Sequence, residues 1–397
     1  MFMAPRPTPD SSTVKAAPAG PEREAAFQRM LELVAARRGE IDKLTYVPRD
    51  VVAAMKEAGI FRAATPAMFG GDALPPHVFL EMVERVSRVD GSTGWVAAFG
   101  SANTYTAALP LSAQAKMYAE GPDQVFAGGL YPLQPAQKAE GGWTVSGRWR
   151  FASGCMGADW IGVGITTPGN DASGLPIVRM AVAPAHEVEI VPNWDVIGMQ
   201  GTGSHDTRVE NKFYAEEWVC VRGAPGVVDE PLYRYPAMPY QAQVHAAVNL
   251  GLARAALDLA VEMSGAAKLM PGHARLADRA YFRTTLAKGE AALRAARLFY
   301  YDAAAKAWDV IAAGDELSLE LRTLLRLSAT HAAQTGNDIV QDCYRVCGMA
   351  TIEKTNRMQQ IARDAMVVIQ HQSLNDATLE NCGTILTGLA PPPNFPG

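Results

Sequence analysis

The sequence is poor in the features of metal-binding and disulfide-bonded proteins. It has 5 cysteines in 397 residues, an odd number, and no two of them form a Cys-x-x-Cys pair. The 7 histidines are scattered, so no zinc-ligand spacing is present. We therefore expect no metal site and no disulfide framework, and free thiols favour a reducing cytoplasm.

Concentrated positive charge and long apolar runs are also lacking. The formal net charge is −5 at pH 7 and the Lys and Arg residues are spread along the chain, which gives no footprint for nucleic acid or a membrane. Residues 1–20 contain no apolar core of the signal-peptide type, and no later stretch reaches membrane-span length. The sequence predicts a disordered leader at residues 1–20, with small molecules and proteins as partners.

The chain divides into three regions by its hydrophobic pattern. Residues 21–120 have apolar residues at helical spacing, residues 121–225 form short alternating runs of β-forming residues between turns, and residues 226–390 return to long helical stretches. No Gly-x-Gly-x-x-Gly motif opens a strand-turn-helix unit, so a Rossmann dinucleotide site is not expected. The pattern predicts an α+β protein, mainly α, with an N-terminal helical domain, a central β domain and a C-terminal four-helix bundle.

Short motifs relate this three-part order to a known family. They are GSTGWV (91–96), FASGC (151–155), GTGSHD (201–206), RDA (363–365) and HQSLN (371–375). Together they resemble the acyl-CoA dehydrogenase superfamily over roughly residues 25–390. Within it they resemble the oxygenase components of two-component flavin-dependent monooxygenases (group D), of the p-hydroxyphenylacetate and secosteroid hydroxylase type. The resemblance implies the acyl-CoA dehydrogenase fold, whose central β domain is barrel-like.

The segment after Arg363-Asp364-Ala365 distinguishes two activities within the superfamily. Dehydrogenases of the medium-chain type carry a catalytic glutamate in this segment, and an ungapped count places Gln372 at its position. An amide cannot accept the substrate α-proton as a carboxylate does, which disfavours dehydrogenation. The neighbouring HQSLN sequence resembles the His-x-x-Leu-Asn of the hydroxylases, in which the histidine lies against the substrate. The resemblance makes His371 the leading catalytic candidate, able to orient a substrate hydroxyl or accept its proton.

The same resemblance implies a site for reduced FMN or FAD, where O₂ reacts to a flavin C4a-hydroperoxide. Small residues let main-chain N–H groups approach the flavin ring, and a hydroxyl near N5 holds the proton whose loss releases peroxide. By resemblance Ser153 lies near N5 and acts in catalysis. For a Ser-Gly pair taken alone, an ordinary hairpin turn is the alternative. The residues implied to contact the flavin are Phe151, Ala152, Ser153, Gly154, Gly201, Thr202, Gly203 and Ser204.

Two departures from the phenol-hydroxylating relatives concern the substrate. Where those relatives have a second histidine the ungapped count reaches Asn103, and where they have a serine-rich strand this chain has Gly128 and Gly129. The resemblance implies substrate contacts from Asn103, Gly129 and His371, with an amide and open space in place of phenolate-binding groups. We expect a substrate bulkier than a simple p-hydroxyphenyl acid, or one of a different shape.

Several other residues allow two interpretations. The superfamily binds flavin partly through basic groups of the bundle and of a neighbouring subunit. By resemblance, one of three arginines near the start of a bundle helix binds the flavin phosphate. The alternative is that these arginines form a solvated helix face. His205 is either a site residue or a turn residue. Nothing marks Cys155 as a nucleophile, and His245 is expected to be a hydrogen-bonded residue of a packed helix. The three arginines are Arg275, Arg279 and Arg283, and the aromatic residues expected to pack the bundle are Phe299, Tyr300 and Tyr301.

The leading interpretation is a reduced-flavin-dependent monooxygenase that hydroxylates an aromatic or related ring. It implies a separate NAD(P)H flavin reductase as partner and, from the way such bundles pack, a homotetramer. The alternatives are an N- or S-oxygenating member of the same branch, an acyl-CoA dehydrogenase or oxidase with bound FAD, and a non-enzymatic relative. The sequence leaves open the substrate, the oxidised position and the choice between FMN and FAD.

Overall fold

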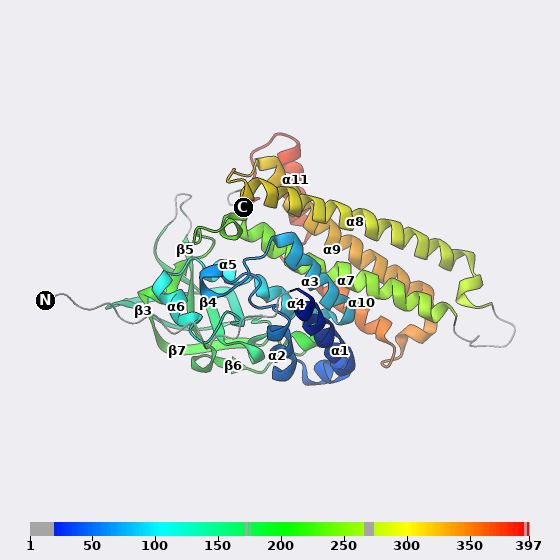
Figure 1. Ribbon diagram of the computed structural model, residues 1–397, viewed down its shortest axis with the longest axis horizontal. Coiled ribbons are helices and arrows are strands. Elements are labelled where there is room, and N and C mark those ends of the chain that lie inside the picture. Colours follow the sequence, from blue (N-terminus) through cyan, green and yellow to red (C-terminus); the bar gives the residue numbers. More distant parts are fainter. Residues whose placement is uncertain (1–19, 171–173, 175, 266–273, 393–394, 397) are drawn as a thin grey trace.

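The computed structural model describes residues 20–170, 174, 176–265, 274–392 and 395–396, and it begins with a group of helices (Figure 1). The predicted leader lies outside the described residues except for Gly20. Helix α3 buries an apolar stripe that includes Phe79, Leu80 and Val83, and this stripe faces the later helix α7. The helices of this region are α1 (Pro21–Leu44), α2 (Arg49–Glu57), α3 (Pro76–Val89), α4 (Gly91–Ala98), α5 (Asn103–Thr106) and α6 (Leu111–Met117).

A β region follows, built from two four-stranded sheets. One sheet has the order β1-β4-β5-β8 and the other the order β2-β3-β7-β6. The chain leaves the second sheet at the end of β3 and enters the first at β4, so residues 150–159 cross between the sheets. The strands are β1 (Phe126–Pro135), β2 (Gln137–Ala139), β3 (Gly142–Trp149), β4 (Trp160–Asn170), β5 (Pro176–Pro184), β6 (Glu189–Val191), β7 (Asp206–Ala215) and β8 (Val219–Val221).

The sheets are joined by a buried tryptophan. Trp149 is fully buried, and its indole Nε1–H donates to the carbonyl oxygen of Gly164 on β4 at 2.7 Å. A buried indole N–H needs such a partner, because leaving it unpaired would cost free energy. Trp149 therefore fixes the end of β3, from which the crossing segment starts.

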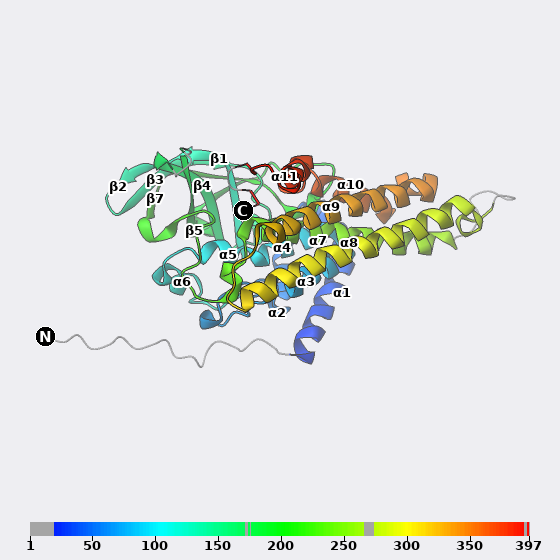
Figure 2. The ribbon, with the colours of Figure 1, turned by 90° about the horizontal axis from the view of Figure 1, so that it is seen from above.

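The last region is a bundle of long helices that extends away from the sheets (Figure 2). Helix α7 packs against α3 on one side and α9 on the other, while α8 packs mainly on α9. The predicted order of helices, β region and helical bundle is the order observed. The helices are α7 (Ala237–Ser264), α8 (Ala280–Ala312), α9 (Leu319–Cys347), α10 (Arg357–Val368) and α11 (Asp376–Leu386).

Helix α7 corrects one expectation from the sequence. It is long and apolar enough to cross a membrane, by length and composition, although no stretch of that kind was expected. However, 78% of its most apolar window is buried inside the protein. Its apolar character is explained by its central place between α3 and α9.

Candidate active site

The two predicted flavin segments lie side by side and are joined by main-chain hydrogen bonds. The amide of Ala152 donates to the carbonyl oxygen of His205 at 3.0 Å, and the amide of Gly154 donates to that of Thr202 at 2.8 Å. One segment belongs to the crossing between β3 and β4, and the other leads from β6 into β7. The structure thus brings together residues that lie far apart in the sequence.

Hydroxyl groups connect the same two segments. The hydroxyl oxygens of Ser153 and Ser204 are 2.6 Å apart, and that of Thr202 is 2.6 Å from Ser204. The indole Nε1–H of Trp95, on α4, donates to Ser153 Oγ at 3.2 Å. These three hydroxyl residues are buried. Three hydroxyls and an indole therefore form one hydrogen-bonded chain, protected from water.

The first residue of this site is held in a strained conformation. Phe151 has a φ of 63°, in the left-handed region that non-glycine residues rarely adopt. Its side chain is 55% exposed and meets Trp194 edge-on, with ring centroids 6.2 Å apart. Strain in a bulky residue beside a functional segment, with its apolar ring exposed, fits a surface that receives a planar ring. The observation supports a flavin contact.

The second segment contains glycines where neighbouring residues leave no room for a side chain, a reason that the sequence did not reveal. A Cβ at Gly201 would lie 2.4 Å from Ile41 Cγ2, and a Cβ at Gly203 would lie 2.7 Å from Tyr46 Cβ. Gly201 also donates its amide to the hydroxyl of Ser92 at 3.1 Å. The segment needs these glycines because it packs closely on α1 and α4.

A cluster of aromatic rings lies next to the hydroxyl chain. The rings of His245 and His371 are stacked, with centroids 4.6 Å apart, and the indole of Trp95 is 4.2 Å from His245 and 5.8 Å from His371. His245 comes from α7 and His371 from the turn after α10. The prediction that His245 is a hydrogen-bonded residue of a packed helix is correct, but it missed this contact with His371.

Both histidines are held in the neutral form. Burial lowers the pKa of His245 to about 4. Burial also holds the pKa of His371 well below its usual value, and His245, Arg326 and Arg222 lower it further. His371 was expected to orient a substrate hydroxyl or accept its proton. Because its pKa is lowered, its ring is a weaker proton acceptor than a histidine in water.

Hydrogen bonds fix a different tautomer for each ring. His245 Nδ1 lies 2.7 Å from the carbonyl oxygen of Gln241, which can only accept, so His245 carries its proton on Nδ1. The amide of Ser373 donates to His371 Nδ1 at 3.3 Å, so neutral His371 carries its proton on Nε2. The pair therefore offers an acceptor at His245 Nε2 and a donor at His371 Nε2.

The residues predicted to contact the substrate lie in more restricted surroundings than expected. The Asn103 side chain is buried and donates to the carbonyl oxygen of Phe61 at 3.1 Å and to Thr65 Oγ1 at 2.7 Å. A Cβ at Gly129 would lie 2.7 Å from the carbonyl oxygen of Arg150, and one at Gly128 would lie 3.0 Å from that of Gly162. The expected open space is thus wrong, because main chain fills it.

Three other predicted positions lie as follows. Gln372 is exposed, next to the half-buried residue His371. His205 is not a simple turn residue, since its Nδ1 accepts the amides of Asn193 and Trp194 at 3.1 and 3.0 Å. Cys155 is buried and its pKa is raised to about 12 by burial, as suits an unreactive thiol.

The candidate phosphate-binding arginines lie at the start of α8, at the end of the bundle away from the sheets (Figure 1). Arg275 pairs with Asp278 at 3.0 Å, and Arg283 donates to the carbonyl oxygen of Ala277 at 2.8 Å. Arg279 donates to the hydroxyl of Tyr281 at 2.9 Å. Because the start of α8 lies away from the sheets, these arginines do not lie beside the Phe151 segment of the same chain (Figure 1).

The aromatic residues of α8 pack as predicted. Tyr300 is fully buried and its hydroxyl donates to the carbonyl oxygen of Gln243 at 2.6 Å. Tyr301 donates to Glu84 at 2.6 Å, and Phe299 packs near His331. Across the described part of the chain, no group of acidic, histidine and cysteine side chains could hold a metal ion.

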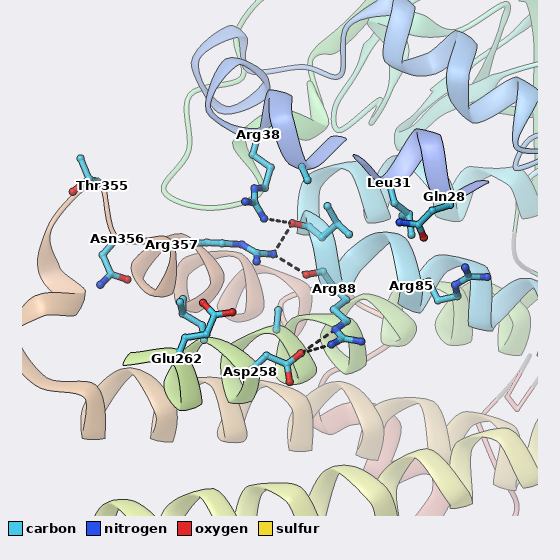
Figure 3. A pocket seen from close by; sticks show the side chains of 14 residues that line it. Gln28, Leu31, Arg38, Arg85, Arg88, Asp258, Glu262, Thr355, Asn356 and Arg357 are labelled. Atoms are coloured by element: carbon cyan, nitrogen blue, oxygen red, sulfur yellow. Dashed lines mark hydrogen bonds and ion pairs between the residues drawn. The ribbon is translucent and has the colours of Figure 1, made fainter. Parts of the chain in front are cut away.

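A groove of about 980 Å³ is lined by none of the predicted site residues (Figure 3). It lies between α1, α3, α7 and the start of α10, and several arginines line it. Arg357 donates to the carbonyl oxygens of Arg88 and Val89 at 2.7 and 2.5 Å, and Arg38 donates to that of Val89 at 3.2 Å. These arginines stabilise the C-terminal end of α3, which explains their presence without a ligand.

The site and fold can now be compared with known proteins. The sequence matches the family described as acyl-CoA dehydrogenase, N-terminal domain, over residues 23–115 and the family described as acyl-CoA dehydrogenase, C-terminal domain, over residues 243–376. A crystal structure of 3-HSA hydroxylase from Rhodococcus sp. RHA1 superposes with a TM-score of 0.85 at 25% identity, covering 93% of this chain and 97% of that one. The acyl-CoA dehydrogenase fold is thereby confirmed.

Curated relatives define the branch. Indole-3-acetate monooxygenase of Pseudomonas putida is 42% identical over 97% of this chain and 100% of its own length, and that of Acinetobacter baumannii is 39% identical over 90% and 92%. The oxygenase component of FADH₂-dependent resorcinol hydroxylase from Rhizobium sp. is 29% identical over 87% and 89%. The chain belongs to the oxygenase components of flavin-dependent monooxygenases. It is an oxidoreductase that uses reduced flavin and O₂, as the motifs predicted.

Proposed function

We propose that the protein oxygenates an indole ring that carries a carboxylate side chain, with indole-3-acetate as the substrate to test first. The names of two relatives support this substrate. The observation on which the proposal chiefly depends is the cluster of Trp95, His245 and His371, which combines aromatic faces with one acceptor and one donor. An indole has a flat apolar body and a single N–H, and it is complementary to such a cluster.

The two joined segments are the proposed flavin contacts. The chain of buried hydroxyls suits the polar edge of a flavin, and the exposed ring of Phe151 suits its apolar part. When bound, reduced flavin supplies the two electrons with which one atom of O₂ enters the substrate and the other leaves as water. Ser153 Oγ, which contacts both Trp95 and Ser204, holds a proton next to the ring.

The histidine pair is proposed to act on the substrate. His245 Nε2 accepts the indole N–H, and this hydrogen bond raises the electron density of the ring carbons that are oxidised. His371 Nε2–H donates to the oxygen that enters the substrate and stabilises negative charge there. His245 is buried and His371 is half-buried, so water has limited access to these hydrogen bonds.

The proposed protein partners are those expected for an oxygenase component of this family. A separate NAD(P)H flavin reductase supplies the reduced flavin. The name of the resorcinol hydroxylase, which is called an oxygenase component, supports this proposal. We also propose a homotetramer, in which exposed apolar side chains of α8 such as Leu298 and Tyr281 pack against another copy. A cytoplasmic location is proposed because all five cysteines are free and buried.

The test supplies the purified protein with a flavin reductase, NADH, FMN or FAD, and ¹⁸O₂. We expect indole-3-acetate to gain one labelled oxygen atom, only when the reductase is present. Parallel reactions contain 4-hydroxyphenylacetate or a saturated acyl-CoA. Efficient oxygenation of the phenol without oxygenation of the indole would show that the substrate is assigned wrongly, and sedimentation of the same sample gives the number of subunits.

A further inference from the structure

Arg326 is a buried cation with no acidic partner among the described residues. It lies on α9 and is 6% exposed. Its Nη1 donates to the carbonyl oxygen of Met238 at 3.3 Å and its Nη2 to Thr378 Oγ1 at 3.4 Å, both long hydrogen bonds, while its Nε has no partner. The groups that raise its pKa, against the lowering by burial, are Cys382 and Tyr105, and neither is a carboxylate.

Such an arrangement is unusual for an arginine. Guanidinium groups remain charged in proteins, and a buried charge is normally paired with an opposite one, because removal from water is costly. Arg326 keeps part of its hydrogen-bonding capacity unused. An arginine whose fork-shaped donors match a carboxylate, and which lacks one in the described part of the protein, is suited to bind one from outside.

Arg326 is linked to the histidine pair through two short connections. On one side, Thr378 donates to the carbonyl oxygen of Ser373 at 3.3 Å, and the amide of Ser373 donates to His371 Nδ1. On the other side, Met238 belongs to the first turn of α7, the helix that carries His245. The charge of Arg326 is one of the causes that lower the pKa of His371. The guanidinium therefore lies at the side of the site that carries the histidines.

We propose that Arg326 binds the carboxylate of the substrate and so selects acidic indoles over neutral ones. The inference rests on the proposed function, since it assigns one part of the same substrate to one residue. Arg326 would hold the side-chain carboxylate while the ring lies against His245 and His371. Nη2, held by its hydrogen bond to Thr378 Oγ1, and the unpartnered Nε are the donors offered to this carboxylate.

Arg222 is the other cation that acts on His371, and it is less suited to this role. It is half-buried, so water satisfies part of its charge. Its Nη2 donates to Gln241 Oε1 at 3.3 Å. Its contact with Gln241, next to the carbonyl that orients His245, indicates a positioning residue.

The test compares indole-3-acetate with its neutral amide, indole-3-acetamide, in the complete reaction with reductase. We measure kcat and KM for the unmodified protein and for Arg326→Gln, Arg326→Lys, Arg222→Gln and Arg322→Gln. Arg322 is the matched control, because it lies one turn earlier on α9 and donates to the carbonyl oxygen of Leu317. Flavin binding and thermal unfolding are recorded for each variant to identify any that fail to fold.

For Arg326→Gln we expect kcat/KM for the acid to fall on the order of 100-fold, chiefly through KM, because a buried charge pair is lost. For the neutral amide, kcat/KM should change by less than about 3-fold, because the amide has no charge for Arg326 to bind. Arg326→Lys should recover part of the loss, whereas Arg322→Gln should resemble the unmodified protein. An equal loss for acid and amide in Arg326→Gln, or the full selective loss in Arg222→Gln alone, would overturn the assignment.

The unmodified protein provides an independent measurement. It should prefer the acid to the amide by at least about 10-fold in KM, and equal KM values would refute the proposal even if Arg326→Gln does not fold. If the unmodified protein oxygenates neither indole, the proposed function itself is wrong. If it oxygenates both with equal KM, the function stands and only the role of Arg326 fails.

Discussion

The stacked rings of His245 and His371, with centroids 4.6 Å apart and planes inclined by 23°, present opposite hydrogen-bonding atoms. The Gln241 carbonyl fixes the proton of His245 on Nδ1, and the Ser373 amide leaves the proton of His371 on Nε2. Two stacked histidines are not both charged, since like charges at this distance repel. The burial of His245 and this stacking therefore both favour neutral rings.

The first prediction concerns the acceptor. In His245→Phe the ring still packs on Trp95 and His371, but the acceptor at Nε2 is lost. We expect kcat for indole-3-acetate to fall about 100-fold, with flavin binding unchanged. His331→Phe, an exposed histidine on α9, is the control. If His245→Phe keeps full activity, the ring serves only packing.

The second prediction concerns stability at low pH. The unfolded chain protonates His245 near pH 6.5, whereas the folded protein does so only near pH 4. As pH falls below 6.5, the unfolded state binds more protons and the folded state loses stability, until the loss is complete below about pH 4. With about 1.36 kcal/mol for each pKa unit, the loss from His245 is about 3 kcal/mol.

The measurement is the melting temperature between pH 7.5 and pH 4 for the unmodified protein and for His245→Phe. The Tm of the variant should decrease less steeply over this range, because it has no imidazole at this position to protonate. Carboxylates titrate in both proteins, so the difference between the two curves isolates the histidine. Parallel curves would mean that His245 is not buried in the neutral form.

The third prediction concerns Ser153. In Ser153→Ala, Trp95 Nε1 loses its hydrogen-bond partner and Ser204 Oγ keeps only its contact with Thr202. We expect the amount of H₂O₂ released for each product molecule to rise on the order of 10-fold, as the loss of one hydrogen bond suggests. Ser112→Ala, an exposed serine that contacts Glu217, is the control. An unchanged ratio would show that the hydroxyl does not act near the flavin.

The sequence predicted the two flavin segments better than the residues proposed to contact the substrate. The motifs around Ser153 and Ser204 are local, and the structure brings their hydroxyls to 2.6 Å. His245 and Arg326 come from the middle of helices α7 and α9, where no spacing distinguishes a site residue from a packed one. Only the three-dimensional crossing of these helices with the turn at His371 brings these side chains close to one another.

The glycines illustrate a second limit of the sequence. Gly129 was interpreted as open space and Gly201 as a place where the cofactor approaches. In the structure, the position of a side chain is taken by the Arg150 carbonyl at Gly129 and by Ile41 at Gly201. A glycine in a sequence indicates that something lies close, but it does not identify the neighbour.

The last prediction follows from this contact of Gly201. In Gly201→Ala the new Cβ would lie 2.4 Å from Ile41 Cγ2 and 2.9 Å from Ser92 Cβ, so α1 or the segment must move. Overpacking of this kind costs about 1–3 kcal/mol. We expect a lower melting temperature and weaker flavin binding, since the displaced segment carries Thr202 and Ser204. Gly39→Ala on α1 is the control, because its Cβ would meet nothing within 4 Å and alanine favours a helix. An equal melting temperature for the two variants would show that α1 yields to the methyl group, and the glycine would then be explained by the cofactor after all.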